Sequence, residues 1–174
     1  MIRPILFNTE MVEGILENRK LNTRRIVKPH TKPPARVGDI LWVRETWEEW
    51  TGGYVYKAWT SPFLQPGYYR GCMRWRPSIH MPKEAARIFL RVTDVRVERL
   101  QDMTLDDFLN EGISIRDEAF NDPENAYMQS KEIFIHIWNS TINKKQHNLY
   151  GWDANPWVWV IEFERCEKPE GWCE

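Results

Sequence analysis

The sequence predicts an α+β fold, a closed or nearly closed β-barrel of five or six strands with two or three flanking helices. Three observations lead to this prediction. Several short segments alternate apolar and polar residues, as strands do. Gly38 and Asp39 form a turn that opens a new strand. Within 87–99 the apolar alternation changes phase near Thr93, which indicates a bulge of the kind that helps a sheet to close.

The first third of the chain predicts three strands and one helix. Residues 5–7 read as a short strand, and Asn8 or Thr9 can cap the helix that follows and ends near Asn18. The apolar stripe of this helix consists of Met11, Val12, Ile15 and Leu16. A basic strand then runs to Val27, the prolines of 29–34 make a loop, and 40–47 reads as a buried strand.

The middle of the chain predicts a hairpin and then an irregular insertion. Gly52 and Gly53 turn the chain into a strand at 54–59. Residues 61–82 contain too many prolines and glycines for regular structure. Such a long irregular loop inside a compact domain is usually functional or disordered. Its aromatic and arginine residues suit base stacking and phosphate binding. The alternative is an arginine-rich loop packed over the barrel.

The last part predicts a strand at 87–99, two helices, a loop and a final strand. Thr104 begins the first helix, Glu111 is its last residue and Gly112 ends it. The second helix starts around 122–123. Its predicted core stripe is Tyr127, Ser130, Ile133, Phe134, Ile137 and Trp138. Residues 139–155 read as a loop. One face of the final strand should carry Trp157, Trp159, Ile161 and Phe163, before a frayed tail.

The length of 174 residues fits one domain with a real hydrophobic core. We expect residues 1–165 to form it, with an insertion at about 61–82 and a C-terminal tail at 166–174. The formal net charge of −1 excludes a protein that coats nucleic acid by bulk attraction, so any such binding needs a local basic patch. Ten tryptophans are more than a core of this size needs, and some of them suit stacking on bases.

The cysteines and histidines predict neither a disulfide framework nor a metal site. Cys72, Cys166 and Cys173 are odd in number and form no C-x-x-C pair, which favours free thiols in a reducing compartment. The four histidines lack the spacing of metal ligands, so we expect no zinc and no other cofactor. The N-terminus lacks the apolar region of a signal peptide, and no run is long enough to span a bilayer. We therefore expect a cytoplasmic protein.

The segment 18–25 concentrates reactive side chains at the junction of a helix and a strand. It contains four cations and one hydroxyl, namely Arg19, Lys20, Arg24, Arg25 and Thr23. In an extended chain Thr23 and Arg25 point to one face, and Asn22 and Arg24 point to the other. Lys20 can swing towards Thr23, and a lysine whose pKa is lowered by burial near other cations can act as base to a threonine nucleophile. A solvated basic turn is the alternative interpretation.

This segment, followed by the Gly38-Asp39 turn and its strand, resembles the ASCH family of the PUA-like superfamily. That family has a G-x-K-x-x-T-x-R signature after its first helix, and here Lys20, Thr23 and Arg25 keep the spacing. Asn18 replaces the usual glycine, a mild change because asparagine tolerates the left-handed conformation of a helix end. The resemblance covers most of the chain, is closest to the longer ASCH proteins of phages and prophages, and implies the PUA-like barrel.

One bacterial branch of the family implies an enzyme, an amidohydrolase that deacylates N4-acetylcytidine with a lysine, a threonine and a glutamate. Lys20 and Thr23 match the first two, and Glu111 best matches the third. Thr23 would attack the amide carbonyl, Lys20 would take its proton, and Glu111 would position the substrate or handle the leaving amine. Arg25 or backbone donors would stabilise the oxyanion.

The rival interpretation is a binding module for RNA or a modified nucleoside or nucleotide, with single-stranded nucleic acid included, in a basic cleft lined by aromatic residues. We place binding slightly ahead, because the insertion suits a ligand larger than a free nucleoside. The residues expected to bind are Lys20, Arg24, Arg25, Arg44, Arg74, Trp75, Arg76 and His80. A metal-dependent nuclease is disfavoured, since the sequence lacks the carboxylate and histidine cluster that it needs.

Overall fold

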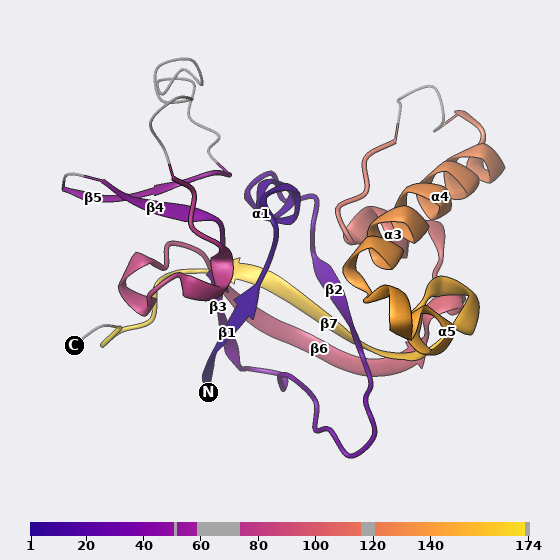
Figure 1. Ribbon diagram of the computed structural model, residues 1–174, viewed down its shortest axis with the longest axis horizontal. Helices are drawn as coiled ribbons and strands as arrows, with labels where there is room; N and C mark the ends of the chain where they lie inside the picture. The colour runs from indigo at the N-terminus through magenta and orange to yellow at the C-terminus, as the bar shows by residue number, and fades with distance from the viewer. Residues whose placement is uncertain (51, 59–73, 116–120, 173–174) are drawn as a thin grey trace. The chain divides into compact units, whose positions relative to one another are not determined.

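The computed structural model describes residues 1–50, 52–58, 74–115 and 121–172 (Figure 1). They form a five-stranded sheet in the order β1-β3-β6-β7-β2 and a two-stranded sheet of β4 and β5. The strands are β1 (Ile2–Leu6), β2 (Asn22–Ile26), β3 (Ile40–Arg44), β4 (Trp47–Trp50), β5 (Gly53–Tyr56), β6 (Phe89–Arg99) and β7 (Trp157–Cys166). The helices are α1 (Thr9–Leu16), α3 (Leu105–Asn110), α4 (Pro123–Thr141) and α5 (His147–Tyr150).

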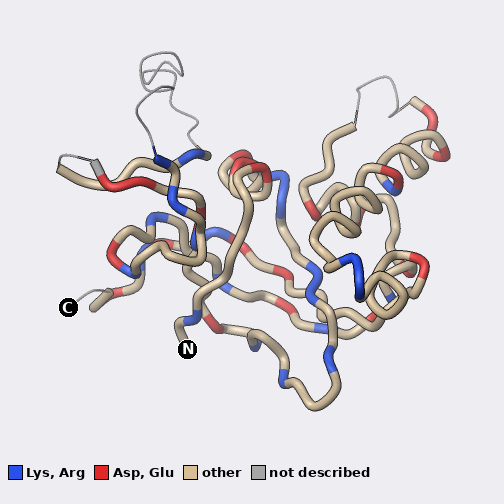
Figure 2. The backbone as a smooth tube through the Cα atoms, viewed as in Figure 1, with Lys and Arg blue, Asp and Glu red and all other residues tan. Residues whose placement is uncertain are grey.

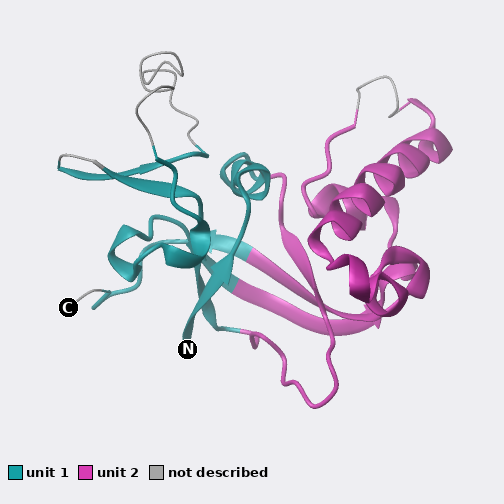
Figure 3. Ribbon diagram, viewed as in Figure 1, with its two compact units in different colours: residues 1–18, 38–91, 164–174 teal, residues 19–37, 92–163 magenta. Residues whose placement is uncertain are grey.

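The predicted α+β class is confirmed, while a closed barrel is not found. Over the described ranges the strand order leaves β1 and β2 as the two edges of the sheet. The chain divides into two compact units, drawn in teal and magenta in Figure 3. Unit 1 contains 1–18, 38–91 and 164–174, and unit 2 contains 19–37 and 92–163. Both β6 and β7 run from one unit into the other.

In unit 1 the N-terminal elements follow the predicted order, with one break. Asn8 caps α1, and its side chain accepts the backbone N–H of Met11 at 2.8 Å. The predicted strand at 40–47 is wrong as one element, because the structure ends β3 at Arg44 and begins β4 at Trp47. The reason lies at Glu45 between them. Its buried carboxylate receives two hydrogen bonds from Arg87, each of 2.9 Å, which pin the chain there.

The hairpin and the C-terminal segment complete the core of unit 1. The predicted hairpin is confirmed as the antiparallel pair of β4 and β5, and Trp47 packs in a cluster with Met81 and Ala85. Part of the predicted insertion, 61–73, lies outside the described residues, as does residue 59 of the predicted strand. The expectation of a frayed tail is wrong at Trp172, which is buried with its ring edge-on to Trp42 and Phe89. Apolar burial outweighs the end of regular structure there.

In unit 2 the helices form a core that the sequence predicted in part. The buried residues of α4 are Ala126, Ser130, Phe134 and Trp138, with a helical spacing of four. The inclusion of Ile133 in that stripe is wrong, because its side chain remains 38% exposed on the flank. The loop predicted at 139–155 is also wrong, since it holds α5 and two 3-10 helices at Lys144–Gln146 and Trp152–Ala154.

In the first half of β7 the buried face is the opposite of the predicted one. Val158 and Val160 are fully buried in the core of unit 2, whereas Trp157 is 48% exposed and Trp159 half-buried. Ile161 and Phe163 are buried on the opposite phase, as predicted. The strand is therefore covered on different faces along its length, and a single alternating pattern cannot describe it.

The described chain holds no helix long and apolar enough to cross a membrane.

Basic and acidic residues are interspersed along the described chain, with basic positions on β2 and acidic ones at the start of α3 (Figure 2). Local pairing of these charges therefore matters more than net charge.

Candidate functional site

Strand β2 presents the predicted signature from within unit 2. It pairs antiparallel with β7, from Asn22 opposite Glu162 to Ile26 opposite Val158. Asn18, just before unit 2 begins, has a φ of 57°, so it takes the left-handed conformation that we expected of it. Strand alternation places Asn22 and Arg24 on one face and Thr23 on the other. Asn22, Thr23 and Arg24 are all buried, which a solvated basic turn would not allow.

Helix α3 brings Glu111 to the start of this strand. A capping box fixes the helix N-terminus, because the Thr104 hydroxyl accepts the Asp107 backbone N–H while the Asp107 carboxylate accepts the Thr104 N–H. At the other end Glu111 is the C-cap, and Lys20 forms an isolated antiparallel bridge with it. The Leu21 N–H donates to the Asn110 carbonyl at 2.7 Å. The end of the helix and the start of the strand are thus bonded through their backbones.

Gly112 makes this close approach feasible. Its φ of +91° is unfavourable for residues with a side chain, and a Cβ there would lie 3.1 Å from the Cβ of Lys20. Glycine therefore serves two needs at this position, the turn out of α3 and the space beside Lys20.

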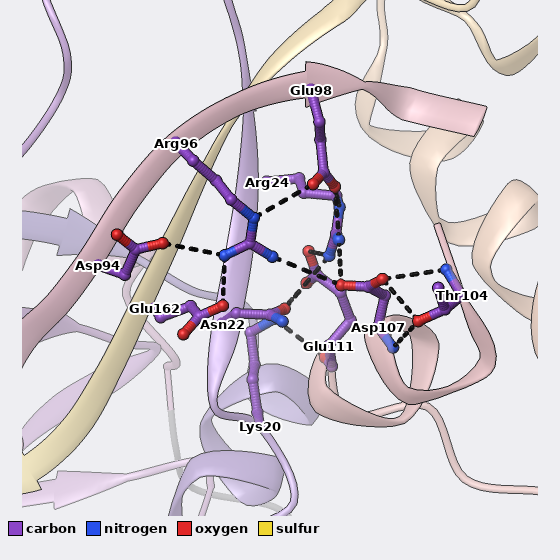
Figure 4. Close-up of polar contacts among 10 residues, drawn as sticks. All are labelled: Lys20, Asn22, Arg24, Asp94, Arg96, Glu98, Thr104, Asp107, Glu111 and Glu162. Atoms are coloured by element: carbon purple, nitrogen blue, oxygen red, sulfur yellow. Dashed lines mark hydrogen bonds and ion pairs between the residues drawn. The ribbon is translucent and has the colours of Figure 1, made fainter. Parts of the chain in front are cut away.

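Lys20 and Glu111 form a buried ion pair although 91 residues separate them (Figure 4). The Lys20 ammonium donates to Glu111 Oε2 at 2.6 Å and to the Glu111 carbonyl oxygen at 2.9 Å. Only 1% of Lys20 is exposed. Burial lowers the pKa of Lys20 below its ordinary value, even though the Glu111 carboxylate acts in the opposite direction. Such a lysine gives up its proton more readily than a surface lysine.

Arg24 joins three carboxylates from two elements. Its Nη2 lies 2.7 Å from Glu98 Oε1 on β6 and 2.7 Å from Asp107 Oδ1 on α3. Its Nη1 lies 3.3 Å from Glu111 Oε1. Burial alone would lower the pKa of Arg24, but these carboxylates raise it above the ordinary value. The guanidinium therefore stays charged and compensates the negative charge of the carboxylates around it.

Arg96 extends the same network towards solvent. It lies 3.1 Å from Asp94, 3.3 Å from Glu98 and 3.7 Å from Asp107, and it also pairs with Glu162 of β7. The residues drawn in Figure 4 include three cations and five carboxylates. The charges of Lys20 and Arg24 are thus compensated within unit 2, and this cluster offers a phosphate little net attraction.

Arg25 and Thr23 occupy the other phase of β2. Arg25 is half-buried, and burial lowers its pKa while Glu111 acts to raise it. Thr23 is 2% exposed and pairs with Ile161 of β7. Both residues thus lie next to Arg24 on the strand that carries the ion-pair network, and their roles stay predictions.

The other predicted binding residues lie in unit 1. Arg44, on β3, is half-buried with its guanidinium 5.4 Å from the centre of the Trp42 ring, and it donates to the Ile79 carbonyl. Arg76 lies over Trp47 at 5.0 Å and 3.2 Å from Glu48 Oε1. The remaining three residues are exposed, namely Arg74, Trp75 and His80. That these residues share a cleft with Lys20 stays a prediction.

Sequence reasoning missed the acidic and basic residues that surround Arg24. Asp94, Arg96 and Glu98 alternate along β6, a period of two that marks one polar face of a strand. Asp107 stands four residues before Glu111, on the same side of α3. These two spacings were the available signals, and the alternation of valines in the same segment masked the first of them.

No family model and no curated protein matches the chain. Two solved structures are similar to it. The ASCH domain from Lactobacillus crispatus JV V101 is 11% identical with a TM-score of 0.45, over 94% of this chain and 79% of that one. The hypothetical protein PH0355 is 13% identical with a TM-score of 0.45, over 95% of this chain and 100% of that one. The neighbours thus include an ASCH domain, the family that the motif resembles, but likenesses of this size indicate no ligand or activity.

Proposed function

We propose that the protein is an amidohydrolase that removes the acyl group from N4-acylated cytidine, with Lys20, Thr23 and Glu111 as its reactive set. The observation that supports an enzyme is the buried Lys20 ammonium, 2.6 Å from Glu111 Oε2. A buried lysine with a lowered pKa suits general base catalysis, whereas phosphate binding favours an exposed and uncompensated cation. The resemblance of the motif to ASCH amidohydrolases supplies the substrate class.

The proposed reaction proceeds through an ester on Thr23. Neutral Lys20 takes the proton of the Thr23 hydroxyl as its oxygen adds to the acyl carbon. The carbon–nitrogen bond then breaks, and the cytidine amine leaves with the proton from the Lys20 ammonium. Neutral Lys20 then takes a proton from a water molecule as its oxygen adds to the ester carbon. The bond between the Thr23 oxygen and the acyl carbon breaks, Thr23 regains its proton from the Lys20 ammonium, and the carboxylic acid is released. Arg25 or backbone N–H groups would stabilise the oxyanion in both steps.

The test of this proposal is the conversion of N4-acetylcytidine to cytidine, followed by chromatography. We expect turnover by the wild type and none by Thr23→Val, which keeps the shape of the side chain and removes its oxygen. Substrate affinity of that variant should stay within about tenfold, because one neutral hydrogen bond contributes only about 0.5–1.5 kcal/mol. Thr23→Ser is the matched control and should keep measurable activity.

Two results would contradict the proposal. The first is wild-type protein that releases no cytidine at any pH between about 6 and about 10, where the upper limit approaches the ordinary lysine pKa of about 10.4. This result would exclude deacylation of this substrate. Equal turnover by the wild type and Thr23→Val would exclude Thr23 as the nucleophile.

Binding of RNA or a modified nucleotide is the second candidate, and one observation in unit 1 favours it. Trp75 is 39% exposed between two exposed arginines, Arg74 and Arg76. An aromatic ring flanked by guanidinium groups suits base stacking with phosphate contacts.

A gel shift with single-stranded RNA at low salt tests this candidate. Trp75→Ala should weaken binding by about 1–3 kcal/mol if the ring stacks on a base. Trp157→Ala is the matched control, because Trp157 is also exposed but lies in unit 2 beside Arg99. No retained RNA, or equal losses in the two variants, would count against a binding site at Trp75.

A further inference from the structure

We infer that Arg24 is a positioning residue that keeps Lys20 able to lose its proton, because it draws one oxygen of the Glu111 carboxylate away from the ammonium. The inference rests on the proposed function, in which Lys20 acts as a base. It extends the reactive set to a residue that does not touch the reacting atoms.

The two oxygens of Glu111 are divided between two cations. Oε2 accepts from Lys20 at 2.6 Å, and Oε1 accepts from Arg24 Nη1 at 3.3 Å. A carboxylate shared in this way stabilises each cation less than it would stabilise one alone, and the two cations also repel each other. Without Arg24 the Glu111 carboxylate would interact with the Lys20 ammonium alone. The ammonium would then be more stable, and Lys20 would lose its proton less readily.

Arg24 is itself held in place for this role. Its Nη2 and Nε bind Glu98 at 2.7 and 3.1 Å, and its Nη2 binds Asp107 at 2.7 Å. Asp107 and Glu111 stand one turn apart on α3, so the guanidinium fork spans that turn. A lysine at this position would keep the charge but could not hold both carboxylates with the same geometry.

Other charged groups near Lys20 do not replace Arg24. Arg25 also acts to lower the pKa of Lys20, from the next position of β2. Arg19 directs its Nη1 to the Gly112 carbonyl at 2.9 Å. Arg96 pairs with Asp94, Glu98, Asp107 and Glu162, so it shares two partners with Arg24. Arg96 therefore provides a matched control for the loss of one network arginine.

The direct experiment measures the pKa of Lys20 by NMR, in protein labelled with 13C-lysine, from the pH dependence of its Cε–Hε signal. The signal is assigned by its absence in Lys20→Met. Arg24→Gln should raise the pKa of Lys20 by about one pH unit or more. Arg96→Gln should leave it unchanged. Arg24→Lys should raise it by less than Arg24→Gln does, because the charge remains while the guanidinium fork is lost. An unchanged or lowered pKa in Arg24→Gln would overturn the inference.

Removal of Arg24 leaves carboxylates without their partner, so thermal unfolding must first show that the variant is folded. If Arg24→Gln does not fold, Arg24→Gln combined with Glu98→Gln takes its place, because it removes one of those negative charges. The expected rise in the pKa of Lys20 is the same in both.

Activity separates a positioning role from a purely structural one. In Arg24→Gln the lower limb of the kcat profile should move to higher pH and activity should recover at alkaline pH. The loss at neutral pH should be about tenfold for each pH unit that the limb moves. An equal loss at every pH would mean a structural role and would overturn the inference. If the wild type deacylates nothing, the proposed function fails on its own, while the NMR titration still decides whether Arg24 acts on Lys20.

Discussion

At the scale of single residues, the cations Lys20 and Arg24 of unit 2 are buried in an ion-pair network rather than exposed to solvent. Lys20 and Arg24 were expected to be candidate phosphate ligands, yet each is at most 3% exposed and bonded to carboxylates. Buried ion pairs contribute little net stability, because desolvation offsets their attraction. A function that needs a readily deprotonated lysine gives a reason for such an arrangement.

The lowered pKa of Lys20 predicts how stability changes with pH. Between that lowered pKa and the ordinary value of 10.5, the unfolded chain binds a proton at Lys20 that the folded protein has lost. The free energy of unfolding therefore rises with pH across this window, and the stabilisation is lost as pH falls through the lowered pKa. Urea unfolding of the wild type and Lys20→Met at several pH values measures this change in the free energy of unfolding. The wild type should gain stability relative to Lys20→Met as pH rises, and parallel curves would contradict a lowered pKa.

At the scale of elements, the contact between the end of α3 and the start of β2 depends on Gly112. We predict that Gly112→Ala is more destabilising than Gly52→Ala. Both glycines have positive φ, +91° and +93°, so each alanine adopts a backbone conformation that costs about 1–3 kcal/mol. Only at Gly112 does the new Cβ also meet Lys20, at 3.1 Å, which adds an overpacking cost of about 1–3 kcal/mol.

Urea unfolding of the two glycine variants isolates this second cost, since nothing lies within 4 Å of a Cβ at Gly52. If the two variants lose the same stability, the close approach of Gly112 to Lys20 is not a structural constraint. A larger loss at Gly112 should be accompanied by a changed pKa of Lys20.

The elements that the sequence predicted well are those whose signals are local. Asn8 caps its helix as expected, and two further helices begin where they were expected to, after Thr104 and at Pro123. These starts were visible because a cap is made by residues within one turn. The break at Glu45 was missed because it depends on Arg87, 42 residues away. Contacts of that range leave no periodic pattern in a single sequence.

The site shows the same division between local and distant signals. The spacing of Lys20 and Thr23 was visible in the sequence, since both belong to one strand entry. Glu111 could be placed beside Lys20 only through the resemblance, and the structure brings the two into contact. The partners Glu98 and Asp107 come from two other segments, so only the fold could reveal that they converge on Arg24.

At the scale of the whole molecule, each unit has a core of its own, and the core of unit 1 depends on the C-terminal segment. We predict that Trp172→Ala lowers the free energy of unfolding by about 3–5 kcal/mol, because the ring packs against Trp42 and Phe89. Trp157→Ala should cost only about 0.5–1 kcal/mol, since that ring is half exposed and contacts Arg99. Thermal unfolding compares them, and a small loss for Trp172→Ala would mean that the segment is dispensable.

The composition of unit 1 also has a consequence for how the chain folds as it is made. Its residues are 1–18, 38–91 and 164–174, whereas unit 2 is complete once residue 163 has been added. Domains generally fold as units, from the N-terminal side first, as the ribosome releases them. Here the opposite order follows, because unit 1 must wait for Trp172. On the ribosome, residues 1–18 are therefore synthesised before unit 2 but become fully packed only after it.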